Sequence, residues 1–597
     1  MKLLRLKITD QDGFRSLPSG FEHHFRTEWG LQDELAQPDG FAPFVCAGPN
    51  GSGKSNLLEA LAAIFYQLEV LRVRRSFLPE VLQDEAPDVL PVAYELEYFI
   101  KLPKEYRTSD SPTFAHVVVI KEAGGSPWLR WENNEAFPSE GASSRLTDEE
   151  RDFLLPQYVL GYSSGENEIL SLPFFKMRFV QFDEYWNALA KQLPYPGYPE
   201  TRLAYLDSGF SQAILLCNLL FQDKATLQPF REDIGIGELK QFRIILRRSI
   251  PATRHQLAAF TSGDFIMPTE TEDGRFADTD AVYLDPTTGD YRLKLLHGLE
   301  ANERTKNTSI IEKLKRCATL HFHDEASDTL TLDYWVNEHT QKAFRANFDD
   351  SPLALFQALQ VLLVLNLYSV SETLKADLYT STSHYVSETV PTLASDERAM
   401  RIKNFYFSKQ GVEKPMLLKE LSDGEHQLLH SLGLCLLFRD TNSLFLLDEP
   451  ETHFNPDWRA NFISRLRQCL PGNSECAQEM LLTTHTPFLI SDSKPDKVLV
   501  FAKDKSSGKV SISHPPYNTL GASINKITMS TFGKRETIGG HAQALLEATR
   551  ARFEQGGEDK QALITEVDKQ LGDSVEKVLL IKAILDGDQR GDGEAQG

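Results

Sequence analysis

The stretch Gly48–Ser55 reads GPNGSGKS, and it decides the fold. It fits the pattern G-x-x-x-x-G-K-[ST], follows the apolar run Phe41–Gly48, and precedes a segment of helical periodicity, Ser55–Leu68. Glycines let successive backbone N–H groups point at phosphate oxygens, and the start of a helix adds the positive end of its dipole. The sequence therefore predicts a strand, a phosphate-binding loop (P-loop) and a helix, in that order.

The chemistry of this loop assigns roles to its side chains. Lys54 is expected to neutralise the β- and γ-phosphate oxygens of ATP, and Ser55 to offer its hydroxyl to Mg²⁺. The predicted nucleotide-binding residues of the segment are Asn50, Gly51, Ser52, Gly53, Lys54, Ser55 and Asn56.

A second motif, SLFLLDEPE, spans Ser443–Glu451. Its apolar run predicts a buried parallel strand that delivers acids at its carboxyl end. Asp448 would hold Mg²⁺ through water, and Glu449 would take a proton from the attacking water as a general base. An apolar strand followed by two acids is common, so the motif gains its meaning from the others.

The segment Leu421–Glu425 reads LSDGE and opens a helical stretch, HQLLHSLGLCLLF. Ser422 stands at an N-cap position, and the segment is either a plain helix cap or a second phosphate site. LSDGE resembles the LSGGQ signature of ABC ATPases, in the form with a final Glu that SMC- and RecF-like members have. The resemblance implies that Ser422, Gly424 and Glu425 bind nucleotide.

Three further stretches resemble the SMC, RecF and OLD-like branch of these ATPases. TTHTPFLI (Thr483–Ile490) matches the switch-histidine strand, which implies that His485 contacts the γ-phosphate and acts in catalysis. DEPETHFNP (Asp448–Pro456) is similar to the DEPE-x-H-x-x-P run. KLLRLKITDQDGFRSL resembles the first strand and FRS turn of the family, which implies that Arg15 approaches the nucleotide.

The resemblance implies an α/β fold: an ABC ATPase head with a mixed, largely parallel core sheet, an antiparallel side sheet and a large α+β insertion. We find no sustained heptad pattern, so no long coiled coil is expected. The predicted domains are an N-terminal half of the head at 1–165, a mainly helical insertion with β-hairpins at 166–398, a C-terminal half at 399–515, and a helical extension with a disordered tail at 516–597.

The glutamine of the ABC Q-loop, a metal-contacting residue in that family, is the weakest match. Gln157 in LLPQYVLGYSSGENEIL is the candidate for this metal-binding role. The following Ser163, Ser164, Gly165 and Glu166 favour a plain turn.

The net charge of −22 argues against a uniformly basic surface for nucleic acid. Local basic patches could still contact DNA, although short charge runs are usually solvated faces. The candidate patches are Arg72, Arg74 and Arg75; Arg243, Arg247 and Arg248; and Lys313, Lys315 and Arg316.

Other features fit a cytoplasmic protein without a structural metal. The six cysteines lack zinc-ligand spacing, and neither a signal peptide nor a bilayer-length apolar run is recognised. His321 and His323 lie at i, i+2 without a third ligand, which favours exposed hairpin histidines. The aromatic stretch Phe174–Trp186 favours a core or interface over a base-stacking platform.

Function is inferred from these motifs. One P-loop and one signature per chain imply a homodimer that sandwiches ATP, because in the family each signature completes the site of the other subunit. KVLVFAKDKSSGKVSI lacks the Glu-Gly of a TOPRIM nuclease. The layout then resembles bacterial defence ATPases, such as Septu PtuA-like and restriction-associated ones, that act with a separate effector such as a nuclease. The alternatives are a RecF- or SMC-like DNA repair ATPase and a nuclease whose catalytic site lies in the insertion.

Overall fold

A computed structural model provides the structure of the chain. It describes residues 1–36, 41–73, 82, 90–107, 112–136, 146–164, 169–190, 195, 202–252, 281–285, 288–300, 309–383, 390–470, 476–504, 506–533 and 538–586. The expected disordered tail, 587–597, and the patch residues Arg74 and Arg75 lie outside these ranges.

A seven-stranded sheet forms the centre of the molecule, in the order β20-β19-β3-β18-β17-β7-β8. All neighbouring strands are parallel except β20, which runs antiparallel to β19. The strands are β3 (Phe44–Ala47), β7 (Tyr158–Ser163), β8 (Leu203–Tyr205), β17 (Ser443–Asp448), β18 (Glu479–Thr484), β19 (Val498–Lys503) and β20 (Val510–Ser513). The predicted mixed, largely parallel core sheet is confirmed.

The core sheet separates two hydrophobic cores, because successive side chains of a strand point to opposite faces. In β3, Phe44 and Cys46 enter one core, whereas Val45 and Ala47 enter the other. The first core also contains the P-loop helix α2 (Lys54–Arg72), and the second contains α5 (Ser208–Phe221), α13 (Asp423–Leu437) and α14 (Pro456–Cys469). Burial on both faces explains why these strands read as continuous apolar runs.

An antiparallel side sheet packs on the α2 side of the core sheet, as predicted. Its order is β2-β1-β4-β5-β6, and β1 pairs with both β2 and β4. The elements of this region are β1 (Lys2–Ile8), β2 (Glu22–His24), α1 (Glu28–Ala36), β4 (Tyr94–Lys101), β5 (Phe114–Lys121), β6 (Trp128–Trp131) and α3 (Asp148–Leu154).

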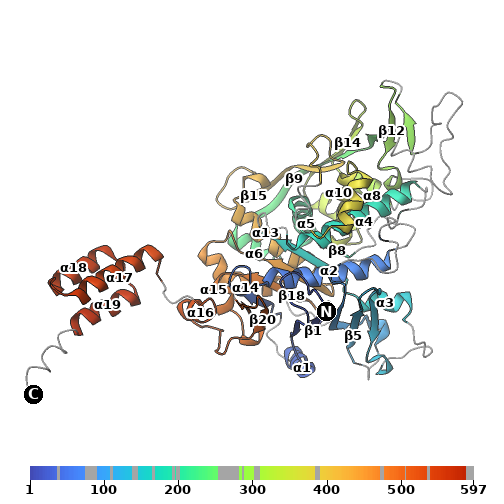
Figure 1. The fold of residues 1–597 in the computed structure, drawn as a ribbon. Helices are drawn as coiled ribbons and strands as arrows, with labels where there is room; N and C mark the ends of the chain where they lie inside the picture. The colour runs from blue at the N-terminus through green and yellow to red at the C-terminus, as the bar shows by residue number, and fades with distance from the viewer. Residues whose placement is uncertain are drawn as a thin grey trace, which may run out of the picture.

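The middle of the chain forms a lobe that lies above the core sheet in Figure 1. Its five-stranded antiparallel sheet has the order β13-β14-β9-β15-β16, and a three-stranded sheet has the order β10-β12-β11. The two expected hairpins are β11–β12 and β13–β14. The strands are β9 (Ile236–Arg247), β10 (Ser249–Pro251), β11 (Val282–Leu284), β12 (Tyr291–Lys294), β13 (Leu320–Asp324), β14 (Thr329–Trp335), β15 (Met400–Lys409) and β16 (Met416–Leu417).

Further helices belong to the middle of the chain. They are α4 (Ser171–Ala190), α6 (Gln228–Asp233), α8 (Ile310–Cys317), α9 (Glu338–Asn347), α10 (Pro352–Val364) and α11 (Glu372–Thr380). Phe174, Phe179 and Phe182 of α4 are buried, which confirms that this aromatic stretch is core. The two regions exchange strands: β8 extends the core sheet and β15 pairs with β9 of the lobe, across the boundaries expected at 165 and 398.

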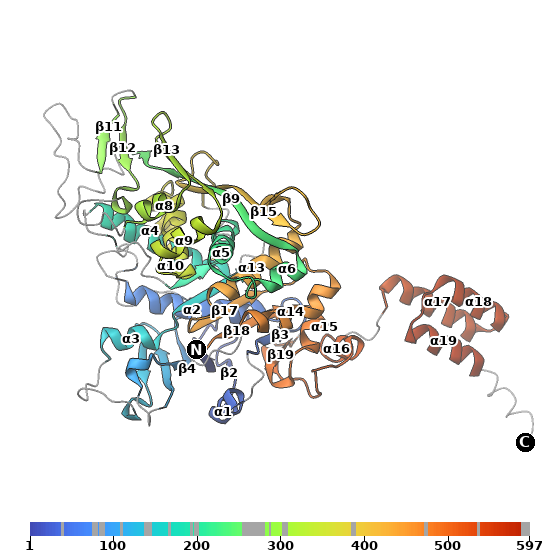
Figure 2. The ribbon, with the colours of Figure 1, turned by 180° about the vertical axis from the view of Figure 1, so that it is seen from behind.

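The C-terminal part begins with α15 (Pro487–Ser491) and α16 (Ile524–Ser530), which pack beside the core sheet. A three-helix bundle follows, and Figure 2 shows it apart from the rest of the chain. Its helices are α17 (Gly540–Gln555), α18 (Lys560–Gln570) and α19 (Val575–Asp586), and they share a small core of their own.

Within the described ranges, no single helix has both the length and the apolar composition needed to cross a bilayer. One bent pair, Glu338–Asn347 with Pro352–Leu367, meets the requirement by length and composition alone. Both helices contribute buried side chains to the core of the lobe.

Candidate functional site

The P-loop connects the carboxyl end of β3 to the first residue of α2. Gly48, Gly51 and Gly53 have positive φ angles of 150°, 72° and 97°, which glycine adopts at little cost. A Cβ on Gly48 would lie 2.5 Å from the carbonyl oxygen of Phe501, so the turn also has no room for a side chain there. No side chain caps the start of α2, which leaves its first N–H groups directed into the loop.

Lys54 is buried, and its Nζ donates to the carbonyl oxygens of Gly48 and Pro49, each at 3.1 Å. Burial lowers the pKa of Lys54, and the nearby Glu449 and Asp448 oppose this shift. The hydroxyl of Ser52 is also buried, with no hydrogen-bond partner. A phosphate in the loop would accept hydrogen bonds from the Lys54 ammonium and the Ser52 hydroxyl, so the residues present fit a nucleoside triphosphate.

Asp448 ends β17 beside the P-loop, as predicted. Its Oδ1 accepts hydrogen bonds from the hydroxyls of Ser55 at 2.8 Å and Thr483 at 2.6 Å, and its Oδ2 lies 3.5 Å from the hydroxyl of Ser163. Burial raises the pKa of the Asp448 carboxyl. A buried carboxylate facing a serine hydroxyl is an oxygen donor set that suits Mg²⁺, and bound Mg²⁺ would supply charge neutralisation for the phosphates.

Glu449 follows Asp448 in a left-handed conformation, with φ of 50°. Its Oε1 lies 3.1 Å from Nε2 of His485, and both side chains are about one-third exposed. The hydrogen bond from His485 is the largest cause of the lowered pKa of Glu449, which keeps the carboxylate ionised. The structure thus brings the two predicted catalytic residues together at the open edge of the sheet.

Glu451 differs from its neighbour although it is only two residues away. It is buried, and Thr484 donates to its Oε1, while its Oε2 has no hydrogen-bond partner. Burial raises the pKa of Glu451 to about 7. The two acids therefore differ: Glu449 is ionised beside His485 and partly exposed, whereas Glu451 is buried, so only Glu449 is placed where a general base could meet water.

The signature segment caps α13. Ser422 and Glu425 form a capping box, and Glu425 Oε1 also pairs with Lys409 Nζ at 2.5 Å. A Cβ on Gly424 would lie 2.7 Å from the carbonyl oxygen of His453, so this glycine permits close packing on the segment after Glu449. In the described part of the chain, the side-chain hydrogen bonds of Ser422 and Glu425 stay within this cap and Lys409, and none of them reaches the P-loop.

Gln427, one turn into α13, links the signature helix to the catalytic segment. Its Oε1 accepts the backbone N–H of His453 at 2.8 Å, and its Nε2 lies 3.5 Å from the carbonyl oxygen of Glu449. Gln427 and Thr483 were not expected at this site, and Ser163, expected in a plain turn, ends β7. A hydroxyl at the carboxyl end of a central strand is the signal that could have indicated Thr483 and Ser163.

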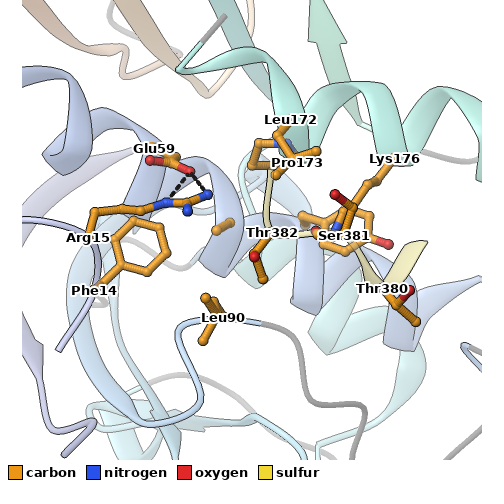
Figure 3. A pocket seen from close by; sticks show the side chains of 12 residues that line it. Phe14, Arg15, Glu59, Leu90, Leu172, Pro173, Lys176, Thr380, Ser381 and Thr382 are labelled. Carbon is orange, nitrogen blue, oxygen red and sulfur yellow. Dashed lines mark hydrogen bonds and ion pairs between the residues drawn. The ribbon is translucent and has the colours of Figure 1, made fainter. Parts of the chain in front are cut away.

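Arg15 does not reach the P-loop in this structure. Its guanidinium donates twice to Oε1 of Glu59 on α2, at 3.0 and 2.8 Å (Figure 3). The pair borders a small cavity of about 30 Å³, which Lys176 also lines. Ser16 lies closer to the loop, because a Cβ on Gly53 would stand 2.7 Å from its hydroxyl.

Asn56 serves this same corner of the structure. Its Oδ1 accepts a hydrogen bond from Ser16 at 2.6 Å, and its Nδ2 lies 3.3 Å from Glu59 Oε2. The contacts of Arg15 and Asn56 therefore hold the turn that contains Arg15 and Ser16 against α2, whereas nucleotide contacts were expected.

Gln157 lies at the wrong end of the sheet for a metal ligand. It precedes β7, and it exchanges hydrogen bonds with Asn442, which precedes β17. Asp448 lies at the other end of these parallel strands, where Ser163 pairs with it. Six residue steps of extended strand place Gln157 about 20 Å from Ser163.

The basic patches are largely neutralised where the structure describes them. Arg243 forms a two-point pair with Asp333, Arg248 pairs with Glu300, Lys315 with Glu312, and Arg72 with Glu69 and Asp152. His323 lies 2.9 Å from Asp328. In the described part of the chain, no cluster of three or more His, Cys, Asp or Glu side chains is arranged to hold a metal ion.

One family model matches the part of the chain that contains the second half of this site. Residues 308–491 match the family model described as "AAA domain, putative AbiEii toxin, Type IV TA system". The matched segment contains the signature, the acidic strand and His485, and it ends before β19. No curated protein matches the chain.

Two solved structures of SMC heads are similar to the chain. "Crystal structure of the SmcHead bound to the C-winged helix domain of ScpA" has 11% identity and a TM-score of 0.30, with 86% of this chain and 97% of that chain covered. "SMC head domain from Thermotoga maritima" has 11% identity and a TM-score of 0.27, covering 86% and 99%. The fold assignment stands on the strand order and the loop geometry described above. Fold and family match together support an ATPase of the ABC or AAA type.

Proposed function

We propose that this chain binds and hydrolyses ATP as a homodimeric switch, with each P-loop closed by the signature of the other subunit. The observation that carries the proposal is the meeting of Lys54, Asp448, Glu449 and His485 at one sheet edge. None of the described contacts links Ser422 to the P-loop of its own chain, which supports a site completed by the signature of a second subunit.

The residues divide the work as follows. Lys54 and the loop N–H groups hold the β- and γ-phosphates, and Ser55 and Asp448 hold Mg²⁺. Glu449 accepts a proton from the water that attacks the γ-phosphate, and His485 orients Glu449 and faces the same phosphate. Hydrolysis removes the group that joins the two subunits, so the chemical step drives separation of the heads.

Mixing two inactive variants tests the composite site. Lys54→Ala destroys the P-loop and Ser422→Arg destroys the signature, so each homodimer has no intact site. A heterodimer of the two has one intact site, because the Ser422→Arg chain offers its P-loop to the signature of the Lys54→Ala chain. With random pairing, an equal mixture should recover about a quarter of wild-type ATPase activity, as expected for a two-fold symmetric dimer.

The matched control is a mixture of Lys54→Ala with Glu449→Gln, in which both lesions fall on the same P-loop half. In this heterodimer one site lacks the lysine of its P-loop and the other lacks its general base. Neither site is intact, because the P-loop and the base of each site come from the same chain. No activity should return. Equal activity of the two mixtures, or none in either, would overturn the composite-site model.

We further propose that the switch is the sensor or regulatory part of a bacterial anti-phage defence or restriction-linked system, acts in the cytoplasm and controls a separate effector such as a nuclease. The support is the description of the matched family, which names a toxin of a toxin–antitoxin system. A plaque assay in cells that carry the gene with its neighbours tests this: protection should be lost with Glu449→Gln, and equal protection by that variant would contradict it.

A further inference from the structure

A large cavity lies at the edge of the core sheet opposite to the P-loop. Its volume is about 510 Å³, and residues of α1, of α14 and of the segments that precede β3 and β19 line it. Ala42 and Pro43 belong to this lining and precede β3, whereas the P-loop follows β3. Pockets for organic ligands have volumes of roughly 300–1,000 Å³, so the cavity has room for a small molecule rather than a single ion.

A buried ion network stands at the inner wall of this cavity. Nζ of Lys497 lies 2.6 Å from Oε2 of Glu34, and Nζ of Lys2 lies 2.7 Å from Oε1 of the same carboxylate. The guanidinium of Arg26 pairs with both Glu34 and Glu479. None of the five side chains is more than 17% exposed. Three cations thus share two carboxylates, which leaves one positive charge of the network uncompensated.

Arg467 of α14 adds a second positive charge to the wall. Its Nε is buried, and in the described part of the chain this atom has no hydrogen-bond partner. Burial, and then the neighbouring Arg26, lower the pKa of Lys497, as expected where positive charge is in excess. Asp33 and Asp496 also line the cavity, but both are exposed, so water and salt screen their charges. The buried wall therefore has an excess of two positive charges.

We infer that this cavity binds a small organic phosphate, with the phosphate group held by Arg467 and Lys497. Buried charges are stable when they are paired, and a phosphate monoester brings about two negative charges at neutral pH, which matches the excess. A guanidinium suits phosphate oxygens because its N–H groups can donate in parallel. Phe25, Pro43 and Ile463 also line the cavity and offer apolar surface to the organic part of the ligand.

All tests use the full chain carrying Lys54→Ala. Phosphate in the P-loop then cannot account for a difference between variants, because every variant has the same defective loop. The variant of the new site is Arg467→Met, which keeps an apolar stem of similar length and removes the charge. Its matched control is Lys403→Met, which removes a charge from an exposed position on β15.

The melting temperature without phosphate tests the charge excess. In chloride buffer, Arg467→Met should raise the melting temperature by about 1–2 °C, because it removes an uncompensated charge from the buried wall. Lys403→Met should leave the melting temperature unchanged. An equal or lower melting temperature for Arg467→Met would mean that the charge of Arg467 is already satisfied in the empty protein, and would overturn the inference.

Titration with inorganic phosphate, followed by phosphorus NMR, tests the phosphate position. The Lys54→Ala chain should bind phosphate, and the addition of Arg467→Met should weaken binding by about tenfold or more, since it removes charge-assisted hydrogen bonds. Lys403→Met should bind phosphate as the parent chain does. Equal phosphate affinity with and without Arg467, or no binding to the parent chain, would overturn the inference.

Ribose 5-phosphate tests the organic part. It should bind about tenfold more tightly than inorganic phosphate, because the sugar fills volume that the free ion leaves empty, and uncharged ribose should not compete. Equal affinity for ribose 5-phosphate and inorganic phosphate would restrict the site to the free ion and overturn the assignment of an organic ligand. None of these measurements uses ATP binding or hydrolysis, so this site and the proposed ATPase stand or fall separately.

Discussion

The hydroxyl of Ser55 donates to the carboxylate of Asp448 at 2.8 Å, across 393 residues of sequence. This bond joins the P-loop to the acidic strand within a single sheet, and it defines where Mg²⁺ and the phosphates would meet.

Replacement of Lys54 by Ala should abolish nucleotide binding. The ammonium group is buried and already directed into the loop, so its loss removes the principal charge opposite the phosphates. Titration calorimetry with an ATP analogue measures the affinity, and we expect a loss of at least about 100-fold. Lys403→Ala, an exposed lysine on β15, is the control and should bind as the wild type does.

Glu449→Gln should reduce hydrolysis by about 100-fold or more, because the amide cannot accept the proton from the attacking water. ATP binding should persist, so the variant accumulates as a dimer with ATP that light scattering detects. Thr452→Ala, which removes a weak 3.5 Å contact with the same carboxylate, is a milder comparison. A Glu449→Gln chain that stays monomeric with saturating ATP and Mg²⁺ would contradict the switch model.

Glu451→Gln should stabilise the protein above neutral pH. The pKa of Glu451 is about 7 in the folded state against 4.5 ordinarily, so the native state holds a proton that the unfolded chain releases. Stability is therefore lost as the pH rises from about 4.5 to 7, by about 3 kcal/mol. Glutamine has no such proton. The melting temperature of the variant minus that of the wild type should be larger at pH 8 than at pH 5. An equal difference at the two pH values would refute the raised pKa of Glu451.

Thr483→Val should weaken the response of the ATPase to Mg²⁺. The variant keeps the shape of the side chain but removes the hydroxyl that bonds Asp448 and accepts the N–H of Glu449 at 3.0 Å. Loss of such a supporting bond costs about 10- to 100-fold in metal affinity. The Mg²⁺ concentration for half-maximal hydrolysis should rise, with ATP affinity intact. An unchanged Mg²⁺ dependence would show that the Asp448 carboxylate does not rely on Thr483.

Sequence patterns predicted those parts of the site in which a helix or strand of regular hydrophobic pattern begins or ends in a recognisable motif. The P-loop, the acidic strand and the capped helix of Ser422 all have this form, and the structure contains each element at the expected residues. The roles of Thr483 and Ser163 were not predicted, because hydroxyl side chains are common in strands and the sequence alone does not show which residues lie beside them in the sheet.

Gln157 and Arg15 lie elsewhere than expected, for different physical reasons. Gln157 lies directly before β7, and only the register of β7 with β17 shows that this is the end of the strand opposite to Asp448. Arg15 was placed by resemblance, and the acid that holds it, Glu59, belongs to the P-loop helix, where nothing in the sequence distinguishes a surface acid from a buried partner.

The position of Gln427 has a consequence for how two sites in one dimer would behave. Its side chain connects α13 to the backbone of Glu449. In the proposed dimer, the Ser422 end of α13 would face one nucleotide, whereas Glu449 would act on the other. A shift of that helix on engagement would be felt by the second base, so hydrolysis should rise more steeply than linearly with ATP occupancy, with a Hill coefficient above one that Gln427→Ala removes.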